Sequence, residues 1–208
     1  MKPEKIKAVL FDIDGTLLDS NEMIFRCYEH TFSVHKLPIK TREQIKSQFG
    51  KSLEDCYKFH FPNEDIIKLC ETHLAFQERN LHLSKPFNSV GETLEKLKNT
   101  GIKLVAITVR SKRTSLKTLE FARIAQYFDM IISREDVKNS KPDPEAILKA
   151  LKFLKLSVDE VIFIGDTDID IQTGKNADIK TIKILHDHKK IDSDSVIFDI
   201  KEVLNLIN

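Results

Sequence analysis

The sequence predicts an α/β protein in which a doubly wound parallel sheet carries an inserted all-helical domain. Two observations predict this class. From about residue 86 onward, short apolar runs alternate with segments of helical periodicity, as in parallel βαβ units. Residues 20–86 show helical periodicity alone, without a convincing strand pattern. We therefore expect a Rossmann-like core formed by residues 1–18 and 86–208, interrupted by a helical insert formed by residues 19–85.

The core strands are expected where short apolar runs rich in β-branched residues end at turn or polar residues. In chain order these runs are residues 6–11, 102–108, 130–133, 161–165 and 179–185, with an edge strand at 196–198. Helices are expected between them: one capped by Ser89 and ending just before Gly101, one around residues 116–121, and one that opens at Pro142 and Pro144. A short helix is expected at the end of the chain.

The helical insert is expected to contain four helices. Turn signals at Pro38, at Gly50-Lys51-Ser52 and at Pro62-Asn63 separate the segments of helical periodicity. The predicted helices are residues 22–34, 42–49, 53–61 and 63–81.

The composition is that of a soluble globular protein. Of 208 residues, 41% are hydrophobic and 31% are charged, which argues against disorder. Lys and Arg number 33 against 32 Asp and Glu, so no global field favours nucleic acid or an anionic membrane. The apolar runs are shorter than the roughly 20 residues that span a bilayer. Three widely spaced cysteines indicate reduced thiols, and we expect a cytoplasmic protein without a nucleic-acid or membrane partner.

Two carboxylates, Asp12 and Asp14, follow the first predicted strand directly. Because strand residues two apart point to the same side, both carboxylates are expected to face one way. Unpaired buried charge costs several kcal/mol, so a cation, or a reaction that needs a carboxylate and a carboxylic acid, would explain the pair. The plainer alternative is a strand-end turn, for which Asp-Gly is ordinary chemistry.

Three later polar sites lie at or near predicted strand ends. Thr108 ends the second strand, Lys141 lies in a stiff loop at a helix start, and Asp166 follows the 161–165 strand. Asp170 lies shortly after, whereas Asp168 is expected to be an N-cap or first-turn acid. Because the carboxyl ends of parallel strands meet at one edge, these side chains are expected to gather there. Carboxylates are ligands that Mg²⁺ prefers, so this edge is a candidate magnesium site.

These residues, in this order, resemble the four motifs of the haloacid dehalogenase-like hydrolase superfamily. The motifs are Asp12-Ile13-Asp14-Gly15-Thr16, then Thr108, then Lys141-Pro142, then Gly165-Asp166 with Asp170. The helical insert resembles the cap of phosphoglycolate phosphatase-like members. The resemblance covers the core, about residues 5–18 and 86–200, and places the cap by its position.

The resemblance implies a role for each motif residue. Asp12 would be the nucleophile that forms an aspartyl-phosphate, and Asp14 the general acid and base. Lys141 would neutralise charge around Asp12 and the phosphoryl group, and Thr108 would bond a phosphoryl oxygen. Mg²⁺ would bind Asp12, the backbone carbonyl of Asp14, and Asp166, while Asp170 would orient water or Lys141.

Residues near the motifs are expected to shape the substrate site. Val109 stands where relatives usually carry a small polar residue, so its backbone is expected to supply one phosphate or substrate contact. Lys51, in the loop 49–52, is a candidate substrate residue; the alternative is a simple helix–helix turn. Arg110 and its basic neighbours Lys112 and Arg113 would favour an anionic substrate, although most such clusters are solvated.

Cysteine and histidine also recur together in the helical insert. Three pairs have helical i,i+3 or i,i+4 spacing, which suits zinc, but buried cysteines and surface histidines are the commoner outcome. The pairs are Cys27 with His30, Cys56 with His60, and Cys70 with His73. The stretch His186-Asp187-His188 is interpreted as a solvated loop.

The sequence therefore predicts a Mg²⁺-dependent phosphatase that hydrolyses a small phosphomonoester, either phosphoglycolate-like, a sugar phosphate or a nucleotide. Pyrophosphate stays open as a substrate. A sugar phosphomutase of the same fold is the nearest alternative, because it shares every core motif. A non-catalytic phosphometabolite-binding or regulatory protein is the alternative of another class. A monomer or homodimer is expected.

Overall fold

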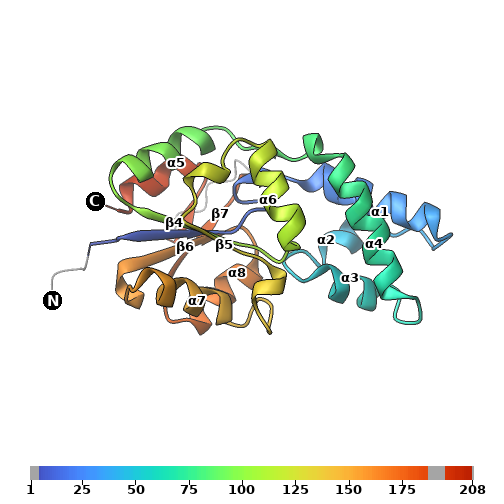
Figure 1. The fold of residues 1–208 in the computed structure, drawn as a ribbon. Helices are drawn as coiled ribbons and strands as arrows, with labels where there is room; N and C mark the ends of the chain where they lie inside the picture. Colours follow the sequence, from blue (N-terminus) through green and yellow to red (C-terminus); the bar gives the residue numbers. More distant parts are fainter. Residues whose placement is uncertain (1–4, 187–194, 208) are drawn as a thin grey trace.

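The computed structural model describes residues 5–186 and 195–207. Its centre is a parallel sheet of six strands in the order β5-β4-β1-β6-β7-β8 (Figure 1). The first strand of the chain therefore lies in the middle of the sheet, with later strands added on both sides. The strands are β1 (Ala8–Phe11), β4 (Lys103–Ile107), β5 (Met130–Ile132), β6 (Val161–Gly165), β7 (Lys180–Ile184) and β8 (Val196–Ile197).

Helices cover both faces of the sheet, with α5 and α6 on one side and α7 and α8 on the other (Figure 1). The α-helices of the core are α5 (Val90–Asn99), α6 (Lys112–Phe121), α7 (Glu145–Leu154) and α8 (Asp168–Asn176). The 3₁₀ helices are η1 (Leu81–Leu83), η2 (Ala125–Tyr127), η3 (Arg134–Asp136), η4 (Val158–Glu160) and η5 (Ile200–Asn205).

Strand β1 illustrates why the central strands are apolar throughout. Val9 and Phe11 point into the cluster formed with α5, α6 and η5. Ala8 and Leu10 point the other way, into the cluster formed with α7. All four side chains are fully buried, as expected for a parallel strand covered on both faces. The polar residues that follow β1 are thereby held at the edge of a rigid layer.

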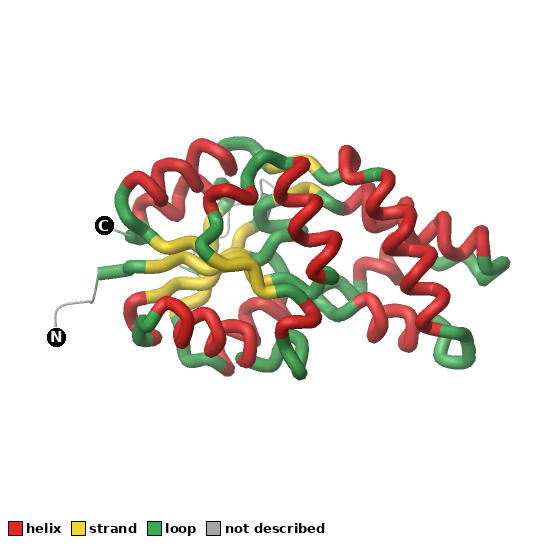
Figure 2. The backbone as a smooth tube through the Cα atoms, viewed as in Figure 1, coloured by secondary structure: helices red, strands yellow, loops and turns green. Residues whose placement is uncertain are grey.

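The helical insert enters and leaves the core through two short paired strands. Strands β2 (Leu18–Asp19) and β3 (Lys85–Pro86) are antiparallel, with Leu18 opposite Pro86 and Asp19 opposite Lys85. Between them, helices account for nearly all of the regular structure, beside the carboxyl edge of the sheet (Figure 2). These helices are α1 (Asn21–Val34), α2 (Arg42–Lys46), α3 (Leu53–His60) and α4 (Ile66–Arg79), followed by η1.

The helical insert has an apolar core of its own. Phe25, Tyr28 and Phe32 of α1 pack with Tyr57 of α3 and Leu69 of α4 in a cluster separate from those around the sheet. Helix α4 packs against both α1 and α3. The insert therefore packs around an apolar cluster of its own, and the domain boundaries at 18/19 and 85/86 stay a prediction.

The predicted elements correspond closely to those observed, and the expected fold class is confirmed. The second insert helix ends at Lys46 rather than residue 49, and the fourth begins after its N-cap, Asp65. Pairing of β2 with β3 was not expected, because two-residue strands carry no periodicity. The short C-terminal helix is a 3₁₀ helix. Within the described residues, no helix is both long and apolar enough to cross a membrane.

Two expectations for histidines are wrong. All three cysteines are buried and free, but His73 is only 4% exposed rather than on the surface, because its Nδ1 pairs with the buried Tyr57 hydroxyl. His186 is half-buried and stacks on Phe87, so it is no solvated loop residue; the other two residues of that stretch, 187 and 188, lie outside the described residues. No Cys–His pair of the insert joins a potential metal-binding group among the residues described.

Candidate active site

The expected polar residues gather at the carboxyl edge of the sheet. Asp12 follows β1, Thr108 follows β4 and Asp166 follows β6, and all three line one cavity of about 210 Å³. The cavity lies between the sheet edge and the helical insert, since both contribute to its walls. Its lining also includes the sequence-predicted residues Asp14, Val109, Asp170 and Lys51.

Lys141 links two of the carboxylates from behind the cavity. Its Nζ donates to Asp12 Oδ1 at 2.6 Å, to Asp170 Oδ1 at 2.7 Å and to the Ile107 carbonyl at 3.0 Å. The lysine is 7% exposed, and burial opposes its charge, but the two carboxylates raise its pKa above the ordinary value. Lys141 is therefore a fixed cation that orients the Asp12 carboxylate.

Three carboxylates lie close together around this single lysine. One oxygen from each of Asp12, Asp166 and Asp170 falls within 4.8 Å of the others. Burial raises the pKa of Asp166 to about 7, with a further contribution from Asp170. Burial likewise raises the pKa of Asp12, against the opposing charge of Lys141. An oxygen-rich cluster with excess negative charge fits a hard divalent cation such as Mg²⁺.

Asp170 contacts Thr167 at the start of α8 as well as Lys141. Its Oδ2 accepts hydrogen bonds from the Thr167 backbone N–H at 3.1 Å and hydroxyl at 2.5 Å. The Thr167 hydroxyl accepts in turn from the Asp170 N–H, forming a capping box at the start of α8. Asp170 is thus fixed on both oxygens. Asp168, as expected, is a first-turn acid, with its side chain 94% exposed beside Lys183.

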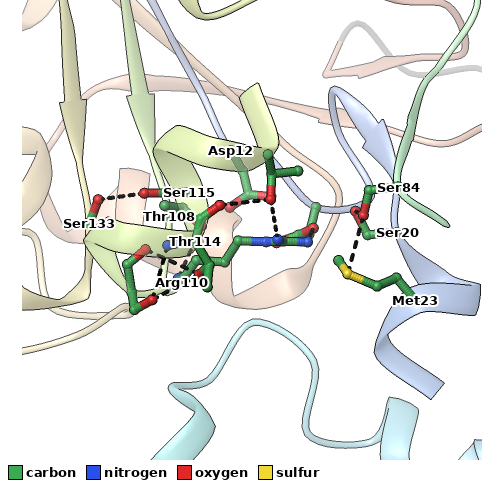
Figure 3. A network of polar contacts seen from close by, with 12 residues as sticks. Asp12, Ser20, Met23, Ser84, Thr108, Arg110, Thr114, Ser115 and Ser133 are labelled. Atoms are coloured by element: carbon green, nitrogen blue, oxygen red, sulfur yellow. Dashed lines mark hydrogen bonds and ion pairs between the residues drawn. The ribbon is translucent and has the colours of Figure 1, made fainter. Parts of the chain in front are cut away.

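Asp14 lies apart from this cluster and pairs with Arg110. The guanidinium donates to both carboxylate oxygens, each at 2.5 Å, in a bidentate arrangement. Burial alone would raise the pKa of Asp14, but the charge and hydrogen bonds of Arg110 outweigh it and hold the pKa below its ordinary value. Arg110 also donates to the Thr118 hydroxyl, so α6 anchors it. Figure 3 shows Arg110 in one polar network with Thr108.

Thr108 is positioned to donate a hydrogen bond into the cavity. Its backbone N–H donates to the Ile132 carbonyl, and its hydroxyl oxygen accepts from the Arg110 N–H at 3.1 Å. The hydroxyl hydrogen has no acceptor among the residues described. Nearby, Ser115 and Ser133 bond to one another at 2.9 Å and tie α6 to the loop after β5 (Figure 3).

Gly15 gives the loop after β1 a backbone conformation that other residues rarely adopt. Its φ of +81° lies in the left-handed region, and a Cβ there would lie 2.2 Å from Asp166 Oδ2. The next residue, Thr16, donates from its hydroxyl to Asp166 Oδ1 at 3.2 Å. Because Gly15 has no side chain, the Asp166 carboxylate can lie against the loop that contains Asp12 and Asp14.

The loop between α2 and α3 closes the opposite side of the cavity. Gly50 has a φ of +85°, and a Cβ there would lie 3.1 Å from the Thr167 hydroxyl, so this loop rests on the start of α8. Ser52 caps α3, as the turn interpretation predicted. Lys51 is exposed, and its Nζ donates to Gln48 Oε1 at 2.9 Å. A substrate role for Lys51 stays a prediction.

Sequence reasoning missed the buried role of Arg110, which was grouped with basic neighbours as mainly solvated. Arg110 is 7% exposed, whereas Lys112 and Arg113 have exposed side chains paired with Asp136 and Glu78. No local sequence pattern distinguishes the buried Arg110 from the exposed Lys112 and Arg113, because the partner of Arg110 lies 96 residues away.

Sequence reasoning also missed two polar residues of α4 that line the cavity. His73 and Gln77 are 4% and 5% exposed. Their signal was present in the sequence: they continue the buried face of α4 that begins with Leu69 and Cys70. A helical period that places polar residues on an apolar face marks them as candidates for a site.

Comparisons with known proteins identify the family of this chain. The model of the family described as haloacid dehalogenase-like hydrolase matches residues 9–184. Pyrophosphatase PpaX of Halalkalibacterium halodurans is 31% identical over 211 residues, covering 98% of this chain and 97% of the relative.

Two solved structures share the fold. One from Haemophilus somnus, described as a predicted phosphoglycolate phosphatase, has a TM-score of 0.86 at 18% identity and covers 99% of both chains. One from Thermotoga maritima, proposed to be a beta-phosphoglucomutase, has a TM-score of 0.74 at 24% identity and covers 97% of this chain and 98% of its own. The family match extends over most of the chain. The protein therefore belongs to the haloacid dehalogenase-like hydrolase family, and the enzyme class expected from its sequence is confirmed.

Proposed function

We propose that this hydrolase is a Mg²⁺-dependent phosphatase that acts on a small phosphomonoester through an aspartyl-phosphate. The observation that carries the proposal is the position of Asp12. Lys141 fixes its carboxylate in the wall of the cavity, beside Asp166 and two residues before a second acid, Asp14. A fixed carboxylate next to a cation site is the arrangement that in-line attack on phosphorus requires.

Asp12 is the proposed nucleophile. One of its carboxylate oxygens attacks phosphorus, and the bond from phosphorus to the leaving oxygen breaks, with its electron pair going to that oxygen. The charge of Lys141 favours the ionised form of Asp12 against the effect of burial, and it offsets the repulsion between the carboxylate and the phosphate. Asp12, the backbone carbonyl of Asp14, and Asp166 would hold Mg²⁺, which supplies positive charge next to the phosphoryl oxygens.

Asp14 is the proposed general acid and base. It leaves Arg110, takes a proton from solvent water and gives that proton to the leaving oxygen. It then accepts a proton from the water that attacks phosphorus, and the bond from phosphorus to Asp12 breaks to release inorganic phosphate. Thr108 donates its hydroxyl hydrogen to a phosphoryl oxygen, and the backbone of Val109, which also lines the cavity, is proposed to supply a further contact.

Asp170 is proposed to act through Lys141. Its two oxygens are held by Lys141 and by Thr167, so the lysine has a second, fixed counter-ion besides Asp12. In the same proposal the helical insert, residues 19–85, is a cap that excludes water during phosphoryl transfer. The cytoplasmic location and the oligomeric state, monomer or homodimer, stay predictions.

The first experiment measures phosphate release with Mg²⁺ and with EDTA. The substrates are phosphoglycolate, sugar phosphates, nucleotides and inorganic pyrophosphate, the last because the relative is named a pyrophosphatase. We expect release that requires Mg²⁺ and falls by at least about a thousandfold in Asp12→Asn. Asp168→Asn is the matched control, because Asp168 is an exposed aspartate at the same edge of the sheet. It should keep full activity.

The alternatives predict different results. Release by Asp12→Asn at the wild-type rate would overturn the proposed nucleophile. Isomerised sugar phosphate without free phosphate would indicate the phosphomutase. Binding of a phosphorylated compound without either product would indicate a non-catalytic binding protein.

A further inference from the structure

Gln77 is a buried polar side chain without a partner. It lies on α4, is 5% exposed, and lines the cavity that also contains Asp12. No hydrogen bond of its side-chain amide is found among the described residues. Neither amide atom of Gln77 is among the fully buried unpartnered atoms of the described residues, so the amide is open to the cavity. It offers donors and an acceptor to a ligand group there.

His73 lies one helical turn before Gln77 and lines the same cavity. Its Nδ1 pairs with the Tyr57 hydroxyl at 2.9 Å, and its Nε2 has no protein partner in the described part of the chain. Burial, with a smaller contribution from Arg110, lowers the pKa of His73 to about 3. The imidazole is therefore neutral at physiological pH. The α4 wall thus presents two neutral hydrogen-bonding groups in adjacent turns.

The positively charged residues that line the cavity belong to its other walls. Arg110 and Arg134 come from the core loops after β4 and β5, and Arg110 is paired with Asp14. Lys51 is exposed and bonded to Gln48. The rest of the insert's wall includes the acid Glu54, the polar Ser20 and Asn21, and the apolar residues Ile24, Phe49, Leu53 and Leu74. A second anionic group would find no cation on the α4 wall.

The cavity has room for more than the phosphoryl group. One water molecule has a share of about 30 Å³ in the liquid, so about 210 Å³ corresponds to roughly seven water molecules. A phosphoryl group fills part of this space. The rest can hold the group on the far side of the scissile bond.

We propose that Gln77 and His73 form a subsite for a neutral, hydroxyl-bearing leaving group, so that the substrate class is a sugar or polyol phosphate. A hydroxyl both donates and accepts, and therefore matches an amide and a neutral imidazole. A leaving group with its own negative charge, as in inorganic pyrophosphate or phosphoglycolate, does not match this wall. The assignment of the hydroxyl-bearing part as leaving group rests on the proposed function.

The test compares three phosphomonoesters: sorbitol 6-phosphate, which carries hydroxyls; phenyl phosphate, which carries none; and phosphoglycolate, which carries a carboxylate. Wild-type kcat/KM should be highest for sorbitol 6-phosphate. Gln77→Leu should lower the ratio of kcat/KM for sorbitol 6-phosphate over phenyl phosphate about tenfold, which equals about 1.4 kcal/mol. Gln77→Lys places a cation on the same wall and should shift preference toward phosphoglycolate about tenfold.

The matched control is Glu71→Leu. Glu71 lies on the same helix, is exposed, and is absent from the cavity lining. It should leave all three ratios unchanged. Equal ratios in wild type and Gln77→Leu, or a wild-type preference for phosphoglycolate over sorbitol 6-phosphate, would overturn the subsite. Thermal denaturation of each variant identifies one that fails to fold, and the two Gln77 variants give independent readouts.

A binding measurement separates this proposal from the proposed function. Calorimetry with sorbitol 6-phosphate and the Asp12→Asn protein requires no turnover. Adding Gln77→Leu to that protein should weaken binding about tenfold, and unchanged binding would overturn the subsite. If no substrate is hydrolysed but Gln77 still governs binding, the proposed phosphatase fails and the subsite stands.

Discussion

Replacing Gly15 by alanine tests whether the position of Asp166 depends on the space left by the missing side chain of Gly15. The new Cβ would lie 2.2 Å from Asp166 Oδ2 and 2.6 Å from its Cγ. Ordinary van der Waals contact begins at 3.4 Å, so the carboxylate oxygen must move by about 1.2 Å. Because Asp166 is a proposed Mg²⁺ ligand, this movement should weaken Mg²⁺ activation. Misplacement by about 1 Å in a catalytic site costs up to about a hundredfold in rate.

Gly101→Ala is the matched control. Gly101 also has a left-handed φ, +83°, but a Cβ there meets nothing within 4 Å. Both variants should therefore lose about 1–2 kcal/mol of stability from backbone strain. For a chain of this size, each kcal/mol lowers Tm by about 2–4 °C. Only Gly15→Ala should also lose activity and require more Mg²⁺.

The assay is phosphate release as a function of Mg²⁺ concentration, with Tm measured in parallel. We expect kcat of Gly15→Ala to fall about a hundredfold and its half-saturating Mg²⁺ concentration to rise, while Gly101→Ala keeps both values. A Gly15→Ala enzyme within about threefold of Gly101→Ala in both quantities would refute the reasoning, because the clash with Asp166 would then have no consequence.

Two further predictions concern pH and ionic strength. The raised pKa of Asp166, about 7, means that the native state keeps a proton that the unfolded state has lost above about pH 4. Stability from this group therefore falls as pH rises from about 4 to 7, on the order of a few kcal/mol. In EDTA, chemical denaturation should show the stability of Asp166→Asn rising relative to that of wild type from about pH 4 to 7, and Mg²⁺ should remove this rise. A stability difference that does not change with pH would contradict the prediction. Separately, Glu78 of α4 pairs with Arg113 of α6 and joins the helical insert to the core. Because Arg113 is 72% exposed, Glu78→Gln should raise KM only about two- to fivefold in low salt and not at all in 0.5 M NaCl. Glu71→Gln on the same helix is the control, and a salt-independent effect of Glu78→Gln would show that the pair is not electrostatic in its action.

The convergence at the sheet edge could be predicted because it follows from local rules. A short apolar strand followed by Asp12 places that residue at a carboxyl end, and parallel strands bring their carboxyl ends together. The same rule places Thr108 and Asp166 nearby. Their lining of one cavity agrees with that expectation. Periodicity likewise located the helices of the insert, since each carries an apolar face toward Tyr57 and its neighbours.

Pairings between distant residues could not be predicted in this way. Asp14 and Arg110 are brought together by the junction of β1 with β4 and by the direction that each side chain takes there. Burial of His73 depends on the Tyr57 hydroxyl from another helix. The β2–β3 pair is too short to have a pattern, and its existence follows from the insert's need to leave the core where it entered.

That narrow entrance has an evolutionary consequence. Because Leu18 faces Pro86 across a two-residue ladder, the ends of the helical insert stay side by side whatever lies between them. The length and identity of the intervening segment are therefore uncoupled from the register of β1 and β4, which carry Asp12 and Thr108. A lineage can exchange or remodel the whole insert, and with it the preferred substrate, while the reaction chemistry is inherited unchanged.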